Sequence, residues 1–231
     1  MNNDTPIKDY TSSGNEDDLR QALETLQDKI ILIMDWVDSN CIRTNESAAL
    51  LNLLSSTSQC VNVFHTSIGN HISILALAVR NLYEINLISR TVLQSEENLN
   101  KWISEAITDN IQVLEGILGI HTTSDLLGPK RILQTEIDRL EEVRAKHGLQ
   151  LTKQPITAAK MAESLGLGEE HKNYYKLFSK LVHPSSYLVN NYANAASSQT
   201  IVILQMLGQK YAFDTVSRIS KHLNIPEHLN N

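Results

Sequence analysis

Apolar residues recur every three to four positions along most of this chain, and polar residues fill the positions between them. This spacing places the apolar side chains on one side of an α-helix. The first stripe follows Asn15, a helix-capping residue, and an acidic first turn of Glu16, Asp17 and Asp18, as the helix dipole favours. Its members are Leu19, Leu23, Leu26, Ile30, Ile33 and Val37. Similar stripes predict helices over about 44–66, 70–93 and 95–118.

Helix boundaries are also visible in the second half of the chain. Pro129 is suited to the first turn of a helix, and Gly148 to the position just after its end. A short helix is predicted over 157–165 before Gly166, another ends near Pro184, and a long one covers 195–223. No segment shows the alternation of a strand. We therefore predict an all-α, antiparallel bundle of about six or seven helices. It would form a single domain over 16–231, preceded by a flexible arm over 1–15.

The composition of the chain limits the classes of function that we expect. With 231 residues and 42% hydrophobic residues, the chain can bury a sizeable core, and aromatic residues are only 5% of it. The formal net charge is −6, so nucleic-acid binding driven by overall charge is not expected. A local basic stripe can still bind a phosphate backbone.

Location can also be predicted. Cys41 and Cys60 lack metal or redox spacing, which indicates a reduced, cytoplasmic setting. The N-terminus does not resemble a signal peptide. The longest apolar run, which begins at Ile72, is interrupted by Arg80 and Glu84 and is typical of a buried helix. We expect no membrane partner.

The segment that ends in His183-Pro184 carries the main chemical signal. On a helix, Lys172, Lys176, Ser179 and His183 share one stripe, with Lys180 at its edge. Neighbouring cations favour the neutral imidazole, which would suit His183 as a general base near neutral pH. Alternatively, His183 caps a carbonyl at the break before Pro184, or bonds to a neighbouring helix.

Arg80 and Glu84 are charged residues on the most apolar helix. A buried charge needs a partner, and residues four apart on a helix can pair. They form either an internal ion pair that joins two helices or one side of a polar pocket. Tyr175 belongs to a group of tyrosines that can stack nucleobases. Nucleotide-loop, nucleophile-elbow and zinc motifs are not found, so we expect no cofactor and no metal.

Three segments, taken in order, resemble an uncharacterised family of helical bacterial proteins. They are Ala78–Ile85 with Arg-x-x-x-Glu, Lys160–Leu167, and Tyr174–Ser185 with Ser-x-x-x-His-Pro-Ser. The resemblance covers about residues 60–190. That family is similar in turn to the HEPN superfamily, which includes metal-independent RNases of toxin and antiviral systems. Those RNases use an Arg-x(4–6)-His motif and dimerise. Here Lys176 stands in place of the arginine, with six residues between it and His183.

Two functions follow from these observations. The first is a HEPN-like binding module for RNA, a nucleotide or a partner protein, with a polar site around His183 and Arg80. The alternative is a metal-independent endoribonuclease of a defence or toxin–antitoxin system, which the resemblance implies would act as a homodimer. In it, His183 would act as base, Lys176 and Arg80 would stabilise the phosphorane, and Glu84 would orient Arg80. The remaining residues, assigned to substrate binding, are Ser179, Lys180 and Tyr175.

Overall fold

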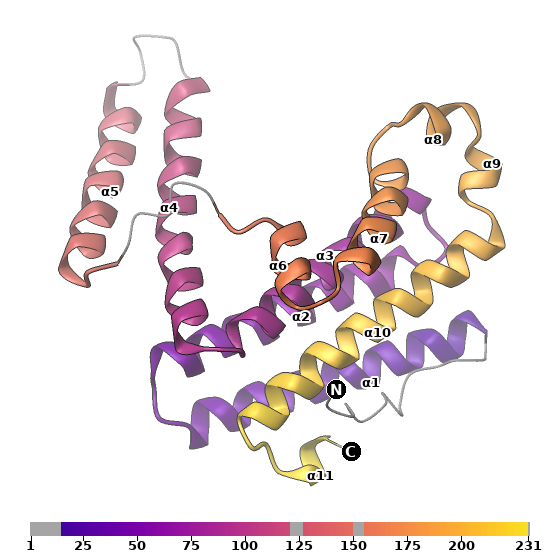
Figure 1. Ribbon diagram of the computed structural model, residues 1–231, viewed down its shortest axis with the longest axis horizontal. Helices are drawn as coiled ribbons and strands as arrows, with labels where there is room; N and C mark the ends of the chain where they lie inside the picture. Colours follow the sequence, from indigo (N-terminus) through magenta and orange to yellow (C-terminus); the bar gives the residue numbers. More distant parts are fainter. Residues whose placement is uncertain (1–14, 121–126, 150–154, 231) are drawn as a thin grey trace. The chain divides into compact units, whose positions relative to one another are not determined.

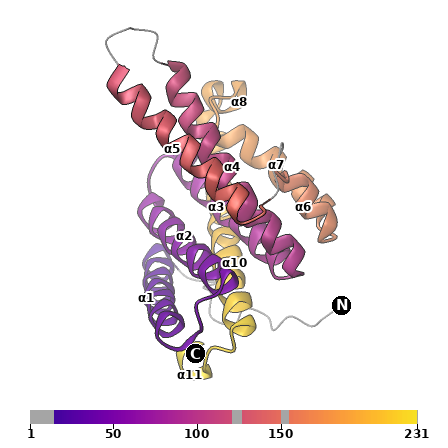
Figure 2. The same ribbon diagram turned by 90° about the vertical axis from the view of Figure 1, so that its left-hand side faces the viewer.

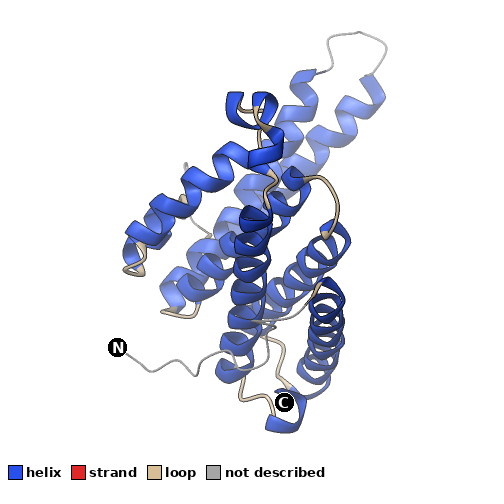
Figure 3. Ribbon diagram, turned by 90° about the vertical axis from the view of Figure 1, so that its right-hand side faces the viewer, coloured by secondary structure: helices blue, strands red, loops and turns tan. Residues whose placement is uncertain are grey.

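The computed structural model describes residues 15–120, 127–149 and 155–230, and there every regular element is a helix (Figure 3). The all-α prediction is therefore confirmed. Residues 1–14 of the predicted arm lie outside the described residues, and Asn15 caps the first helix as expected. The helices are α1 Glu16–Asn40, α2 Asn45–Ser67, α3 Ile72–Val92, α4 Glu96–Ile120, α5 Leu127–Lys146, α6 Ala158–Ser164, α7 Gly168–Leu181, α8 Ser186–Asn190, α9 Tyr192–Ala195, α10 Ser198–His222 and α11 Glu227–Asn230.

These eleven helices exceed the six or seven that we predicted from the sequence. Eight of them correspond to segments that the sequence indicates, and the other three, α8, α9 and α11, have only four or five residues each. So short a helix cannot show a repeating apolar stripe, because one turn already takes 3.6 residues. The longer helices begin and end within a few residues of the predicted boundaries. Gly148 and Gly166 follow α5 and α6 with φ of +61° and +74°, the conformation expected of a glycine after a helix.

The chain divides into two compact units, residues 1–91 with 158–231, and residues 92–157. In the first unit, α1 and α2 form a hairpin, and α10 packs against both (Figure 2). The predicted stripe of α1 is buried throughout. Gly208 allows α10 to approach α2 closely, because a Cβ atom there would lie 2.6 Å from Cζ of Phe64.

Helices α3 and α10 run in the same direction, unlike the neighbours of a purely antiparallel bundle (Figure 1). Tyr83 contacts Tyr211, and three residues further along Asn86 contacts Asp214 and Thr215. Both helices therefore advance together. Helix α3 is the one described helix that is long and apolar enough to span a membrane by length and composition, a test that core helices also pass. Over half of its most apolar stretch is buried.

The second unit is built from α4 and α5. Ile111, Ile137 and Leu140 form its buried centre. Glu105 is also buried there, and one of its carboxylate oxygens accepts a hydrogen bond of 3.2 Å from the backbone N–H of Ile156. The outer side of α5 carries ion pairs, as its many charged residues indicate. The pairs are Arg139 with Glu136 and Arg144 with Glu141.

Candidate functional site

Helix α7 carries the predicted lysines and ends just before His183. Its inward side buries Phe178 and Leu181. The opposite side bears Lys172, Lys176, Lys180 and, one residue beyond the C-cap, His183, all of which are exposed. We call the outward residues the α7 face; they are Lys172, Lys176, Ser179, Lys180 and His183.

Aromatic rings fix the inward side of α7 to α3 and α10. Tyr83 of α3 is the centre of the group, and its ring centroid lies 4.9 Å from that of Tyr211 on α10. Tyr174 and Phe178 of α7 contribute rings at 5.7 and 6.2 Å from Tyr83. Such spacings are those of favourable aromatic pairs. Phe178 therefore belongs to the core, and the partly buried Tyr174 packs at its edge.

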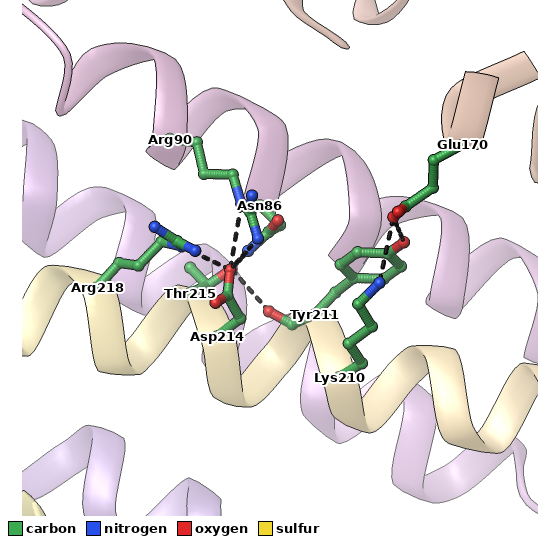
Figure 4. Close-up of polar contacts among 8 residues, drawn as sticks. All are labelled: Asn86, Arg90, Glu170, Lys210, Tyr211, Asp214, Thr215 and Arg218. Atoms are coloured by element: carbon green, nitrogen blue, oxygen red, sulfur yellow. Dashed lines mark hydrogen bonds and ion pairs between the residues drawn. The ribbon is translucent and has the colours of Figure 1, made fainter. Parts of the chain in front are cut away.

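Two neighbouring residues in the first turn of α7 add polar contacts to this aromatic group. A Glu170 oxygen accepts hydrogen bonds from the Tyr211 hydroxyl at 2.7 Å and from Lys210 at 3.2 Å (Figure 4). His171 Nδ1 lies 3.0 Å from the Tyr83 hydroxyl. Burial, together with the negative charge of Glu170, raises the pKa of both tyrosines far above the ordinary range. Both phenols therefore stay protonated. We call Tyr83, Glu170, His171, Lys210 and Tyr211 the Glu170 cluster.

Arg80 and Glu84 pair with each other. Arg80 Nε donates to a Glu84 carboxylate oxygen at 2.8 Å, and both side chains are about one-third exposed. The two residues do pair, but the pair lies within α3 and does not join two helices as predicted. Among the described residues, the hydrogen bonds and ion pairs of Arg80 do not extend to His183 or Lys176. A shared site of Arg80 and His183 stays a prediction.

His183 lies in the bend between α7 and α8, and its side chain is exposed. The carbonyl cap that we considered for it is supplied by another residue. The Ser185 hydroxyl donates to the Lys180 carbonyl at 2.7 Å and accepts from the Leu188 N–H at 3.1 Å. Because Ser185 joins the end of α7 to the start of α8, the His183 ring is not needed to cap this break.

The three residues predicted to bind substrate differ in their accessibility to a ligand. The Ser179 hydroxyl donates to the Lys176 carbonyl at 3.1 Å, so it is turned back onto its own helix. Lys180 is exposed on the α7 face. The Tyr175 ring is 54% exposed, and its centroid lies 5.8 Å from that of His171. Lys180 and Tyr175 are accessible to a ligand.

A second polar cluster joins α3 to α10 and was not predicted. One oxygen of Asp214 accepts hydrogen bonds from Arg90, Arg218 and Asn86 at 2.7 to 3.2 Å (Figure 4). Burial on its own would raise the pKa of Asp214, but these bonds and the positive charge of Arg90 outweigh it and lower the pKa. We call Asn86, Arg90, Asp214, Thr215 and Arg218 the Asp214 cluster. Its members on α3 are distant in sequence from those on α10. The sequence signal that could have indicated the cluster was a polar residue on an apolar stripe.

Comparison with known proteins places the chain in a family. The model of a family of unknown function, DUF5677, matches residues 48–200, well over half of the chain. The chain belongs to the DUF5677 family. The predicted membership of an uncharacterised helical family is thereby confirmed. The matched part of this DUF5677 protein includes α3, α7 and His183, whereas Lys210 and Asp214 follow it. No curated protein and no solved structure matches. The predicted similarity to HEPN proteins therefore has no support from these comparisons.

Proposed function

We propose that this DUF5677 protein is a binding module whose ligand is a polyanion of the RNA or nucleotide class, held on the α7 face. One observation carries the proposal. Lys172, Lys176 and Lys180 are exposed on one stripe of α7, and the exposed His183 follows in the bend just after this helix. Lysines three to four residues apart on a helix are close enough to contact successive phosphates of one strand.

Local charge supports this proposal despite the net charge of −6. Of the two carboxylates in the first turn of α7, Glu170 is turned toward Tyr211 and Lys210. Glu169 pairs with Lys172 at 3.7 Å. Within the described residues, neither Lys176 nor Lys180 has an acidic partner. Their charges are therefore available to a ligand.

The contacts that hold α7 in place also support the proposal. A helix held by buried Phe178 and Leu181 and by the bonds of Glu170 and His171 presents its lysines in a fixed spacing. Because the helix is ordered before binding, ligand binding would cost less conformational entropy than ordering a loop.

The test is a binding titration followed by fluorescence anisotropy, with a labelled twelve-nucleotide single-stranded RNA as probe. The Lys176→Glu/Lys180→Glu variant is compared with Lys101→Glu/Lys221→Glu, which changes the net charge equally at exposed lysines outside α7. Each lysine near an anion contributes about 1 kcal/mol, so we expect the first variant to lose roughly tenfold or more in affinity. The dependence of log K on log salt should also fall by about 1.4 for two lost contacts. Equal affinities of the two variants would rule out the α7 face.

A ribonuclease remains the second candidate, because the exposed His183 follows the exposed Lys180 by three residues at the end of α7. It is weakened by the engagement of Arg80 with Glu84. The same RNA is incubated with wild type and with His183→Ala in EDTA. Cleavage by the wild type alone would make the protein an enzyme, and intact RNA in both would leave the binding module.

A further inference from the structure

Three rings follow one another from the core to the surface next to the α7 face. The innermost is Tyr83, which is buried at 2% exposure. The His171 ring lies 5.9 Å from it and is tilted by only 24°. The Tyr175 ring lies 5.8 Å beyond His171 at 32°, and it is 54% exposed. The three rings thus form two successive contacts, the inner one stacked and the outer one tilted, and the outermost ring is exposed.

This series is held by more than ring contacts. The hydroxyl of Tyr83 lies 3.0 Å from His171 Nδ1, which fixes the plane of the imidazole. Tyr83 itself is packed against Tyr174, Phe178 and Tyr211. His171 is therefore a positioning residue, since it supports one side of the Tyr175 ring while the rest of that ring faces solvent.

We propose that Tyr175, supported by His171, is a stacking platform for an unpaired nucleobase. This inference rests on the proposed function, because Tyr175 adjoins the α7 face. Lys172 precedes it by three residues, Lys176 follows it directly, and Ser179 follows by four. Residues three and four positions away lie next to Tyr175 on the helix surface, which applies to Lys172 and Ser179, whereas the residue that directly follows does not face it. A base on Tyr175 would place an adjoining phosphate at Lys172.

The platform identifies the ligand as single-stranded nucleic acid. In a duplex the bases are stacked on one another and their faces are covered, whereas an unpaired base offers its face to an aromatic ring. Stacking of this kind depends little on base identity, because every base has a π-face. We therefore expect weak sequence preference and clear discrimination against duplexes.

The test separates stacking from phosphate binding. Two labelled eight-nucleotide probes are used, one with bases and one abasic with the same backbone. Tyr175→Ala should lower affinity for the base-bearing probe by about tenfold and leave affinity for the abasic probe unchanged. Tyr175→Phe keeps the ring and should bind both probes like the wild type. A loss by Tyr175→Ala that is equal for both probes, or no loss, would overturn the platform.

Failure of the proposed function gives a different result. If Lys176→Glu/Lys180→Glu binds both probes like the wild type, the α7 face is not a phosphate site. The role of His171 is read from quenching of 2-aminopurine in the base-bearing probe. His171→Ala should reduce the quenching at saturation, and His171→Phe, which restores a ring behind Tyr175, should recover it. Unchanged quenching in His171→Ala would show that Tyr175 needs no support.

Discussion

The Asp214 cluster and the Glu170 cluster both join α10 to other helices of the same unit (Figure 4). Their carboxylates differ in exposure and in the donors that surround them. Asp214 has a side chain only 15% exposed, and two arginines and Asn86 donate to it. Glu170 is 30% exposed and accepts from one phenol and one lysine. The first cluster directs several donors to one oxygen of a mostly buried carboxylate. The second fixes the start of a helix whose other side faces solvent.

The difference shows where a ligand can act. A charge that already has several protein partners at hydrogen-bonding distance offers little to a ligand, because binding would require breaking those bonds. Lys176 and Lys180 on α7 have no acidic partner in the described part of the chain, so their ammonium groups are available to bind an anionic ligand. We therefore assign a structural role to the Asp214 cluster and propose ligand binding at the α7 face, on the helix whose start the Glu170 cluster fixes.

The largest effect is expected from Asp214→Ala. Removal of this carboxylate leaves Arg90 and Arg218 near each other in a mostly buried place without their shared acceptor. Loss of one partner from a buried charge pair costs about 3–5 kcal/mol. Urea unfolding followed by circular dichroism measures the loss as a lower midpoint.

Arg80→Ala is the control for this prediction. It also removes an ion pair, but one within a helix and about one-third exposed. Such pairs contribute only about 0.2–0.5 kcal/mol. If Asp214→Ala is no more destabilising than Arg80→Ala, the contrast between a structural cluster and an accessible one is wrong.

The sequence predicts local features of this fold better than contacts between distant segments. The stripe of α1, the cap at Asn15 and the helix-end glycines depend on residues within a turn or two, so each could be found without the structure. Asn86 and Asp214 are separated by 128 positions, and only the parallel packing of α3 and α10 brings them together.

The same limit applies to the candidate site. The exposed lysines and His183 follow from helical spacing alone, and so does the pairing of Arg80 with Glu84. His171 shows no local signal, because its contact with Tyr83 spans 88 positions. A single sequence gives no register between helices, so the ring series and its place beside the α7 face could not be predicted.

Gly208→Ala tests whether the two polar clusters alone hold α10. The new Cβ atom would lie 2.6 Å from Cζ and 2.7 Å from Cε1 of Phe64, so α10 or the ring must move. Overpacking of this kind costs about 1–3 kcal/mol. The measurement is again a urea midpoint.

A second substitution shows whether the clash is the cause. Phe64→Leu shortens the side chain in contact, so Gly208→Ala should be less harmful in that background than in the wild type. A double-mutant cycle measures this coupling. Additive losses would mean that Gly208 is required for another reason, and the polar clusters would then carry more of the α10 packing than we infer.

Tyr211→Phe tests the hold of the Glu170 cluster on α7. The change removes the hydroxyl that donates to Glu170 at 2.7 Å, and Lys210 remains as a donor. A hydrogen bond to a charged group contributes about 1.5 kcal/mol at the lower end of its range, which suits a partly exposed carboxylate. Hydrogen exchange of the α7 amides should speed up more than that of the α1 amides. Equal acceleration in both helices would show a global loss instead of local release.

The smallest effect concerns pH, and it compares Asp214 with Glu105, the buried carboxylate of the other unit. The pKa of Asp214 is lowered, so the unfolded chain binds more protons at this group. Its stabilising contribution is complete above the ordinary aspartate pKa of about 3.9 and is lost as pH falls toward the lowered value. The urea midpoints of the wild type and of Asp214→Asn should therefore converge as the solution is acidified below pH 4. A constant difference down to acid pH would show that the charge of Asp214 contributes nothing.

Glu105 should behave in the opposite way. Burial raises its pKa, and the bond from the Ile156 N–H and the charge of Lys101 offset only part of that effect. The folded chain then binds more protons than the unfolded chain, so stability falls as pH rises from the ordinary glutamate pKa of about 4.3 through the raised value. Glu105→Gln removes this titration. Between pH 4 and pH 7, the urea midpoint of the wild type should therefore fall relative to that of the variant. If the variant and the wild type show the same change between these two pH values, the Ile156 bond compensates fully for burial. The two carboxylates would then differ only in the number of partners.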